Sequence, residues 1–190
     1  MSSCNARRYL REDQALVGKV NIKGIDKKFS EEALLYVQKE VRPNSRINLA
    51  LYNTFNTHNG TYKTTKIRKI GEAPHILDSS LVEISRTQIE KFLQSKGFFK
   101  AAVKSDITVK NKKASIQFTA VPGPEFKFRK IDYVINDPVV DSLYRKGRES
   151  FTHIHSGQRY DSDSLNFERE QIFLMMKRNG YYDYVRQYVR

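Results

Sequence analysis

Residues 78–99 read DSSLVEISRTQIEKFLQSKGFF, and residues 161–182 read DSDSLNFEREQIFLMMKRNGYY. The two segments align without gaps at a constant offset of 83 residues, from Gly97 to Gly180. Each places apolar residues on one helical stripe: Val82, Ile89, Phe92 and Leu93 in the first, and Leu165, Ile172, Met175 and Met176 in the second. The repeat predicts two modules, each built around an amphipathic helix.

The ends of both predicted helices carry recognisable signals. Ser80 and Glu83 read as a capping box at the start of the first helix, and Asp163 marks the start of the second. Gly97 and Gly180 stand where a helix commonly ends in the left-handed conformation. We therefore assign both glycines a structural role.

A β-hairpin is predicted after the first helix. Apolar residues alternate with polar ones on both sides of a polar turn at 110–113; they are Ala101, Val103, Ile107 and Val109, then Ile116, Phe118 and Ala120. Pro122, Gly123 and Pro124 then interrupt the strand pattern, which gives them a structural role as a break. A further strand is expected over 126–135, before a helix that begins at Asp137-Pro138.

The chain before the first repeated helix opens a module in the same way. Val20 and Ile22 fit a strand, and Ser30 is expected to cap a helix that continues to Val41. The order is then strand, helix, helix, strand, strand, with a long insertion over 42–77 between the two helices. We expect an α+β protein in which each module is a small mixed three-stranded sheet with two helices on one face. The predicted boundaries are a tail at 1–15, a first module at 16–122 and a second, incomplete module at 123–190.

Composition limits the classes of function. The 190 residues hold 34 Lys and Arg against 21 Asp and Glu, for a net charge of +13, which favours an acidic or anionic partner. The apolar runs are far shorter than the roughly 18 residues that a membrane-spanning helix needs. No nucleophile motif, phosphate loop or metal-ligand set is recognisable, so we expect neither an enzyme nor a cofactor.

The junction between the modules carries a family resemblance. The pattern running from Gly97-Phe-Phe through Val121-x-Pro-Gly-Pro124 to Ile131 resembles the junction between consecutive POTRA domains of BamA-like and TamA-like outer-membrane assembly proteins. The segments around Cys4 and over 68–78 are similar to a branch whose mature chain begins at a lipidated cysteine. The resemblance covers nearly the whole chain.

This resemblance implies a periplasmic arm on the inner side of the bacterial outer membrane. Such an arm receives unfolded outer-membrane proteins or accessory assembly subunits, and its second strand lies at a sheet edge that accepts an added strand by β-augmentation. We place that edge on Ala101, Val103, Lys104, Ser105, Asp106, Ile107 and Val109. The equivalent strand of the second module is expected over 184–190. Lys104 and Asp106 leave open the alternative that the edge is protected by charge and simply ends the sheet.

The insertion offers a second candidate surface. It interleaves aromatic and basic residues, namely Tyr52, Phe55, Tyr62, Lys66, Arg68 and Lys69. We interpret these as a docking site for another assembly subunit or as a brace for their own module. A basic nucleic-acid-binding module is the alternative reading, although no RNA-binding signature accompanies the pattern.

Cys4 has two readings. It is a candidate for lipidation that would bring the start of the arm to an anionic membrane surface, where Arg7, Arg8 and Arg11 could meet headgroups. It is otherwise a thiol of no functional consequence.

Overall fold

In a computed structural model of the chain, the structure describes residues 10–58, 61–62 and 72–189. The chain divides into two compact units, which are considered separately below. The first comprises residues up to Phe92 together with Ala101–Pro122. The second comprises Leu93–Lys100 and Gly123–Arg190, so the end of the first repeated helix folds with the second unit.

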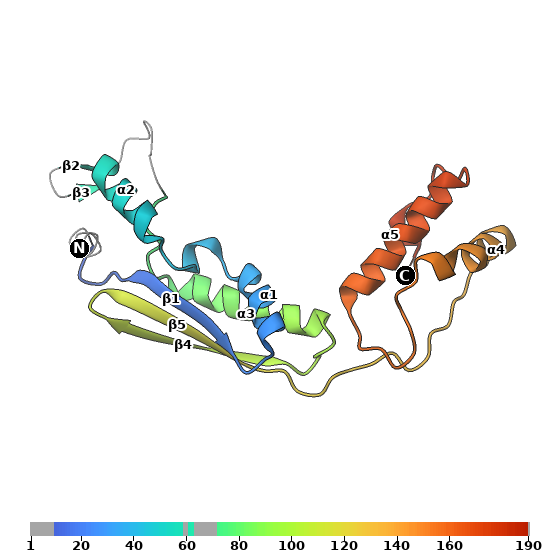
Figure 1. The fold of residues 1–190 in the computed structure, drawn as a ribbon, viewed down its shortest axis with the longest axis horizontal. Coiled ribbons are helices and arrows are strands. Elements are labelled where there is room, and N and C mark those ends of the chain that lie inside the picture. The colour runs from blue at the N-terminus through green and yellow to red at the C-terminus, as the bar shows by residue number, and fades with distance from the viewer. Residues whose placement is uncertain (1–9, 59–60, 63–71, 190) are drawn as a thin grey trace. The chain divides into compact units, whose positions relative to one another are not determined.

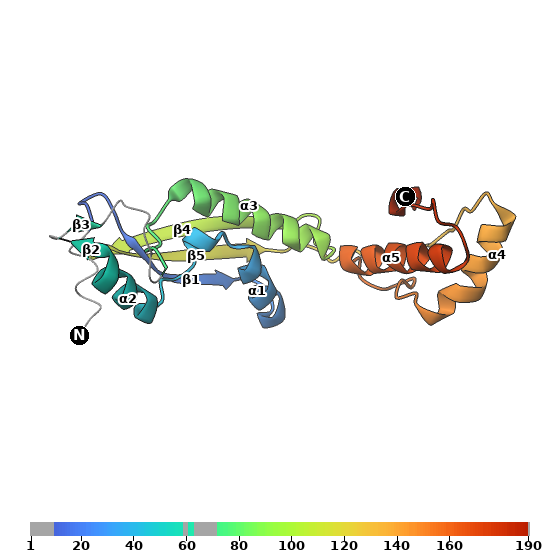
Figure 2. The same ribbon diagram turned by 90° about the horizontal axis from the view of Figure 1, so that it is seen from above.

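The first unit is built on a three-stranded mixed sheet in the order β1-β5-β4 (Figures 1 and 2). Strand β1 (Leu16–Lys23) runs parallel to β5 (Lys113–Val121), and β5 is antiparallel to β4 (Ala102–Lys110). Helices α1 (Lys27–Ala33) and α3 (Ser79–Ser95) lie on one face of this sheet (Figure 1). This confirms the α+β class and the predicted arrangement of sheet and helices.

The core of this unit lies between that face and the two helices. Its fully buried side chains come from β1, α1, α3 and β5 and include Val17, Ala33, Val82, Ile89, Ile116 and Phe118. The predicted stripe of α3 is therefore the buried stripe. Burying a side chain of this size stabilises the fold by about 1.5–3 kcal/mol.

The turn of the β4–β5 hairpin consists of Asn111 and Lys112. Both have positive φ, 50° and 57°, as the two-residue turn that matches strand twist requires. A turn of this kind closes on a hydrogen-bonded residue pair, here Lys110 opposite Lys113. The register of the whole hairpin follows from this pair.

The insertion contains a helix, α2 (Arg46–Asn56), and two short strands, β2 (Thr57–His58) and β3 (Thr61–Tyr62). Its two ends are joined through Asn44, whose side-chain amide donates to the carbonyls of Val17 (2.9 Å) and His75 (2.8 Å). The N–H of Val17 also donates to His75 O at 3.0 Å. The insertion thus covers the start of the outer edge of β1.

The second unit is helical. Helix α4 (Pro138–Gly147) is capped by Asp137, as predicted, and α5 (Ser162–Arg178) is capped by Asp161. Glu168 is buried and accepts hydrogen bonds from the hydroxyls of Tyr144 (2.7 Å) and Thr152 (2.8 Å). Burial raises the pKa of Tyr144, and the hydrogen bond to Glu168 acts in the same direction.

A buried lysine joins the two segments of the second unit. The ammonium of Lys96 lies 2.7 Å from Asp163 and 3.4 Å from Asp161. Desolvation alone would lower the pKa of Lys96, but the hydrogen bond to Asp163 and the charges of both aspartates outweigh it and raise the pKa.

The turns after α3 and α5 match each other. Phe98 N–H donates to Leu93 O, and Tyr181 N–H donates to Met176 O, each at 3.0 Å. Gly97 and Gly180 have φ of 90° and 91°. The donor and acceptor have the same spacing along the chain in both turns. Both repeated helices therefore end in the predicted left-handed glycine turn.

Several predicted details are wrong. Residues 126–135 form no strand beyond a single bridge between Lys127 and Arg159, and Arg186–Tyr188 form a 3-10 turn where a strand was expected. An extended segment becomes a strand only when a neighbour pairs with it, and these two segments do not pair with each other. The caps also lie elsewhere. Asp78, not Ser80, accepts from the first N–H groups of α3, Asp161 replaces Asp163, and Ser30 lies inside α1.

Candidate functional site

Strand β4 forms an edge of the sheet, because among the described strands only β5 pairs with it. Since antiparallel pairs alternate and Lys110 is hydrogen-bonded to Lys113, the even-numbered residues of β4 direct their backbone groups toward β5. The odd-numbered residues direct theirs outward. Ser105, Ile107 and Val109 therefore present an N–H and a C=O each at the sheet edge.

The side chains of β4 divide between two faces. Val103 is buried against the helices, Ser105 is half-buried, and Ile107 and Val109 are 38% and 49% exposed. Apolar cover over this strand therefore decreases toward the hairpin turn. The even-numbered side chains lie on the face opposite the helices, and they are polar and exposed except for Ala102, which is exposed but apolar.

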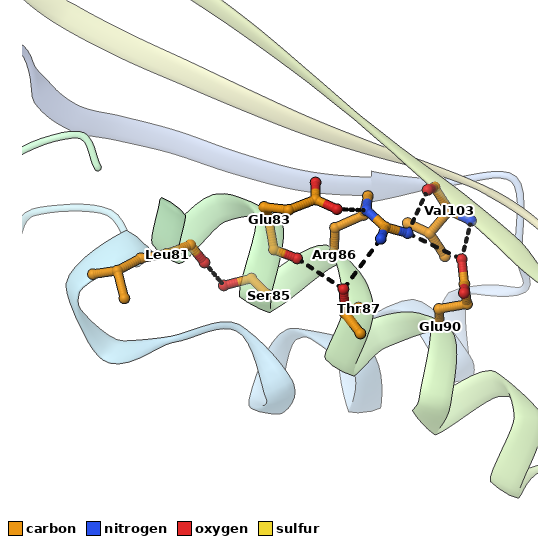
Figure 3. A network of polar contacts seen from close by, with 7 residues as sticks. All are labelled: Leu81, Glu83, Ser85, Arg86, Thr87, Glu90 and Val103. Carbon is orange, nitrogen blue, oxygen red and sulfur yellow. Dashed lines mark hydrogen bonds and ion pairs between the residues drawn. The ribbon is translucent and has the colours of Figure 1, made fainter. Parts of the chain in front are cut away.

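Two side chains of α3 satisfy the outward backbone groups of Val103. The N–H of Val103 donates to Glu90 Oε2 at 3.1 Å, and Arg86 Nη1 donates to the carbonyl of Val103 at 3.2 Å (Figure 3). Arg86 and Glu90 are also ion-paired with each other at 3.1 Å. We call Arg86 and Glu90 together the edge clip.

Arg86 is positioned by further contacts on its own helix. Its Nε donates to Glu83 at 2.6 Å, and Nη2 donates to the hydroxyl of Thr87 at 3.1 Å (Figure 3). The hydrogen bond to Glu83 raises the pKa of Arg86. Because the guanidinium has fixed donor directions, these bonds fix the group that meets Val103.

The structure separates the predicted edge residues into three groups. Ala101 is buried and precedes β4, and the backbone of Val103 is already bonded to the edge clip. Lys104 and Asp106 pair with β5 through their backbones and expose their side chains. The outward positions Ser105, Ile107 and Val109 remain. Among the side chains that the structure describes, those of residues 10–55 and 72–189, none bonds their outward groups.

The aromatic and basic residues of the insertion are only partly described. Tyr52 is 7% exposed and belongs to the interior, whereas Phe55 is 51% exposed on α2. Tyr62 lies in β3, where only its backbone is described. Lys66, Arg68, Lys69 and also Cys4 lie outside the described residues. The burial of Tyr52 removes one member of the predicted docking set from the surface.

Two further features bear on the class of site. Within the described part of the chain, no cluster of three or more His, Cys, Asp or Glu side chains could hold a metal ion. None of the described helices combines the length and apolar character required to cross a bilayer.

The edge clip was not predicted from the sequence, although the repeat contains a signal for half of it. Arg86 and Arg169 occupy equivalent positions at the offset of 83 residues that Gly97 and Gly180 define. Glu90 corresponds to Phe173, so the carboxylate does not recur. The Nε of Arg169 is buried and has no hydrogen-bond partner among the described residues.

Comparisons with known proteins agree with this architecture. The sequence model of the family called POTRA, described as "Surface antigen variable number repeat", matches residues 15–123, more than half of the chain. No curated protein matches the sequence.

Two solved structures are distantly similar. POTRA3-5 of BamA from Haemophilus influenzae is 15% identical with a TM-score of 0.41, and the match covers 88% of this chain and 51% of that one. The N-terminal domain of Omp85 from the thermophilic cyanobacterium Thermosynechococcus elongatus is 11% identical with a TM-score of 0.22, covering 87% of each chain. Our chain spans about half the length of the BamA chain. The family assignment therefore rests on the match to the POTRA sequence model.

Proposed function

Because this chain belongs to the POTRA family, we propose that it holds extended polypeptide segments by pairing them with the free edge of β4. In this role the chain is a periplasmic arm of an outer-membrane protein assembly factor and is not an enzyme. Its partners are unfolded outer-membrane proteins or accessory assembly subunits.

One observation carries the proposal: the outward backbone groups of Ser105, Ile107 and Val109 have no bonding side chain among the described residues. An extended chain laid beside β4 would hydrogen-bond both groups of each residue, which gives affinity with little dependence on sequence. The opposite edge of the sheet is less available, because residues 75–77 and Asn44 cover the start of β1.

The charge of the chain supports an acidic or anionic partner. The net charge is +13, and exposed Lys104 and Lys110 lie on β4 itself. A positive surface raises the rate at which acidic segments reach the edge, and this effect weakens with salt. Acylation of Cys4 remains part of the proposal and would attach the arm to a membrane.

Backbone pairing can be tested with a peptide that cannot pair. The probe is an acidic peptide of about ten residues in which aromatic or β-branched residues alternate with Ser, Thr and Asp, the length of a barrel strand. The controls are two peptides with the same side chains. Each carries N-methyl groups on one of the two sets of alternate amides, so that one of them blocks the edge that faces β4. We expect the unmodified peptide to bind and at least one methylated form to lose tenfold or more in affinity by fluorescence anisotropy, since N-methylation removes the donors and blocks close approach.

Equal affinity of the unmodified peptide and both methylated forms would contradict the proposal, because binding would then depend on side chains alone. A basic peptide of the same pattern tests the role of charge separately. We expect it to bind more weakly at low salt and to approach the acidic peptide as salt is raised.

A further inference from the structure

The edge clip supplies the two hydrogen bonds that a ligand residue would make to Val103. In an antiparallel pair, one residue of an added strand accepts from the outward N–H and donates to the outward C=O of its partner. At Val103 the carboxylate of Glu90 is that acceptor, and the guanidinium of Arg86 is that donor (Figure 3). A side-chain pair thus occupies the place of one residue of an added strand.

We propose that the edge clip fixes where an added strand ends, so that a bound polypeptide pairs with Ser105, Ile107 and Val109 but not with Val103. This inference rests on the proposed function, and it adds the length of the binding edge. The edge clip thereby limits how many residues of an extended chain can pair with β4.

The energetics favour a clip that stays closed. A ligand strand that displaced it would exchange two charge-assisted hydrogen bonds for two neutral ones, which are weaker. It would also leave the side chain of Glu90, whose exposed fraction is only 28%, without its backbone donor. Glu83 and Thr87 hold Arg86 in place from the same helix, so the clip is formed before a ligand arrives.

Residue-resolved amide hydrogen exchange by NMR, with and without a saturating amount of the acidic probe peptide, tests this in the unmodified chain. We expect the amides of Ser105, Ile107 and Val109 to gain protection of at least tenfold when the peptide binds. The amide of Val103 is already bonded to Glu90, so its exchange rate should change less than twofold.

The variant that opens the clip is Arg86→Met combined with Glu90→Met. We expect its Val103 amide to exchange rapidly when free and to gain protection of at least tenfold with peptide, and we expect peptide affinity to rise roughly fivefold, as gained backbone hydrogen bonds imply. The control is Arg145→Met combined with Asp141→Met, which removes the same two charges from an i,i+4 pair on α4. It should leave the exchange pattern of β4 unchanged.

The inward amides of Lys104, Asp106 and Thr108 report whether the sheet of the variant is intact, because they pair with β5. If the double variant loses their protection, Glu90→Ala alone frees the Val103 N–H and gives the same readout. In the double variant, the peptide could protect the amides of Ser105, Ile107 and Val109 and leave the exchange rate of the Val103 amide unchanged. That result overturns the inference but not the proposed function. The inference is also overturned if the peptide protects the amides of Val103, Ser105, Ile107 and Val109 in the unmodified chain while Val103 loses its hydrogen bond to Glu90. No protection of any outward amide overturns both.

Discussion

Ile107→Pro is expected to reduce the affinity for the acidic probe peptide at least tenfold without unfolding the first unit. Ile107 is the middle of the three outward residues, so the substitution removes a central hydrogen-bond donor, and the ring obstructs the approach of a neighbouring strand. An edge strand tolerates proline where the N–H points away from the sheet. The measurement is a titration of the peptide followed by fluorescence anisotropy.

Ile107→Ala is the matched control, because it shortens the same side chain and keeps the N–H. We expect it to change affinity by less than about threefold, since the side chain of Ile107 is already 38% exposed. Circular dichroism and the exchange of the inward β4 amides confirm that both variants are folded. A proline variant that binds as tightly as the alanine variant would rule out pairing at the centre of β4.

Gly97→Ala is expected to destabilise the second unit much more than Gly180→Ala. Both glycines have φ near 90°, so either alanine costs roughly 1–2 kcal/mol for the left-handed conformation. A Cβ at Gly97 would in addition lie 2.6 Å from the carbonyl oxygen of Tyr160, whereas a Cβ at Gly180 would meet nothing within 4 Å. Relieving that clash requires the backbone to move, at roughly a further 2 kcal/mol.

The comparison is internal, because the two positions are equivalent in the repeat and share the same turn. The free energy of unfolding of the second unit can be obtained from hydrogen exchange of α5 amides in each variant. We expect Gly97→Ala to lower it by about twice as much as Gly180→Ala. Equal losses would mean that the turn after α3 needs glycine only for its φ and does not pack closely on Tyr160.

Local patterns in the sequence predicted the first unit well. The stripe of Val82, Ile89 and Phe92 is buried, and the alternation on either side of the turn at 110–113 predicted the hairpin. These elements depend on neighbours within the same stretch of chain. Their periodicity is therefore sufficient to predict them.

The strands expected in the second unit failed for a physical reason. Residues 126–135 and 184–190 have the alternation of strands, but a strand requires a partner, and among the described residues these segments form no ladder. The errors in the predicted helix caps are small shifts in position. Asp78 and Asp161 cap the helices two residues before the predicted Ser80 and Asp163, because the carboxylate of each accepts from the first N–H groups and lets the helix begin earlier.

The candidate site likewise depends on a contact between elements that local sequence patterns do not predict. The position of β4 was predictable from the pattern, but the state of its edge was not, because the edge clip joins residues of α3 to Val103 on a different element. Arg86 and Glu90 have the spacing of an ordinary i,i+4 surface pair, which gives no indication of a contact with a strand. Only the recurrence of arginine at position 169 sets Arg86 apart in the sequence.

The most direct test of strand addition at β4 is an NMR or crystal structure of the chain with the acidic probe peptide bound. We predict that the peptide forms a fourth strand beside β4, hydrogen-bonded to Ser105, Ile107 and Val109, with Val103 still held by Arg86 and Glu90. A peptide bound on the helices or on the insertion, with the outward groups of β4 left free, would contradict strand addition at β4.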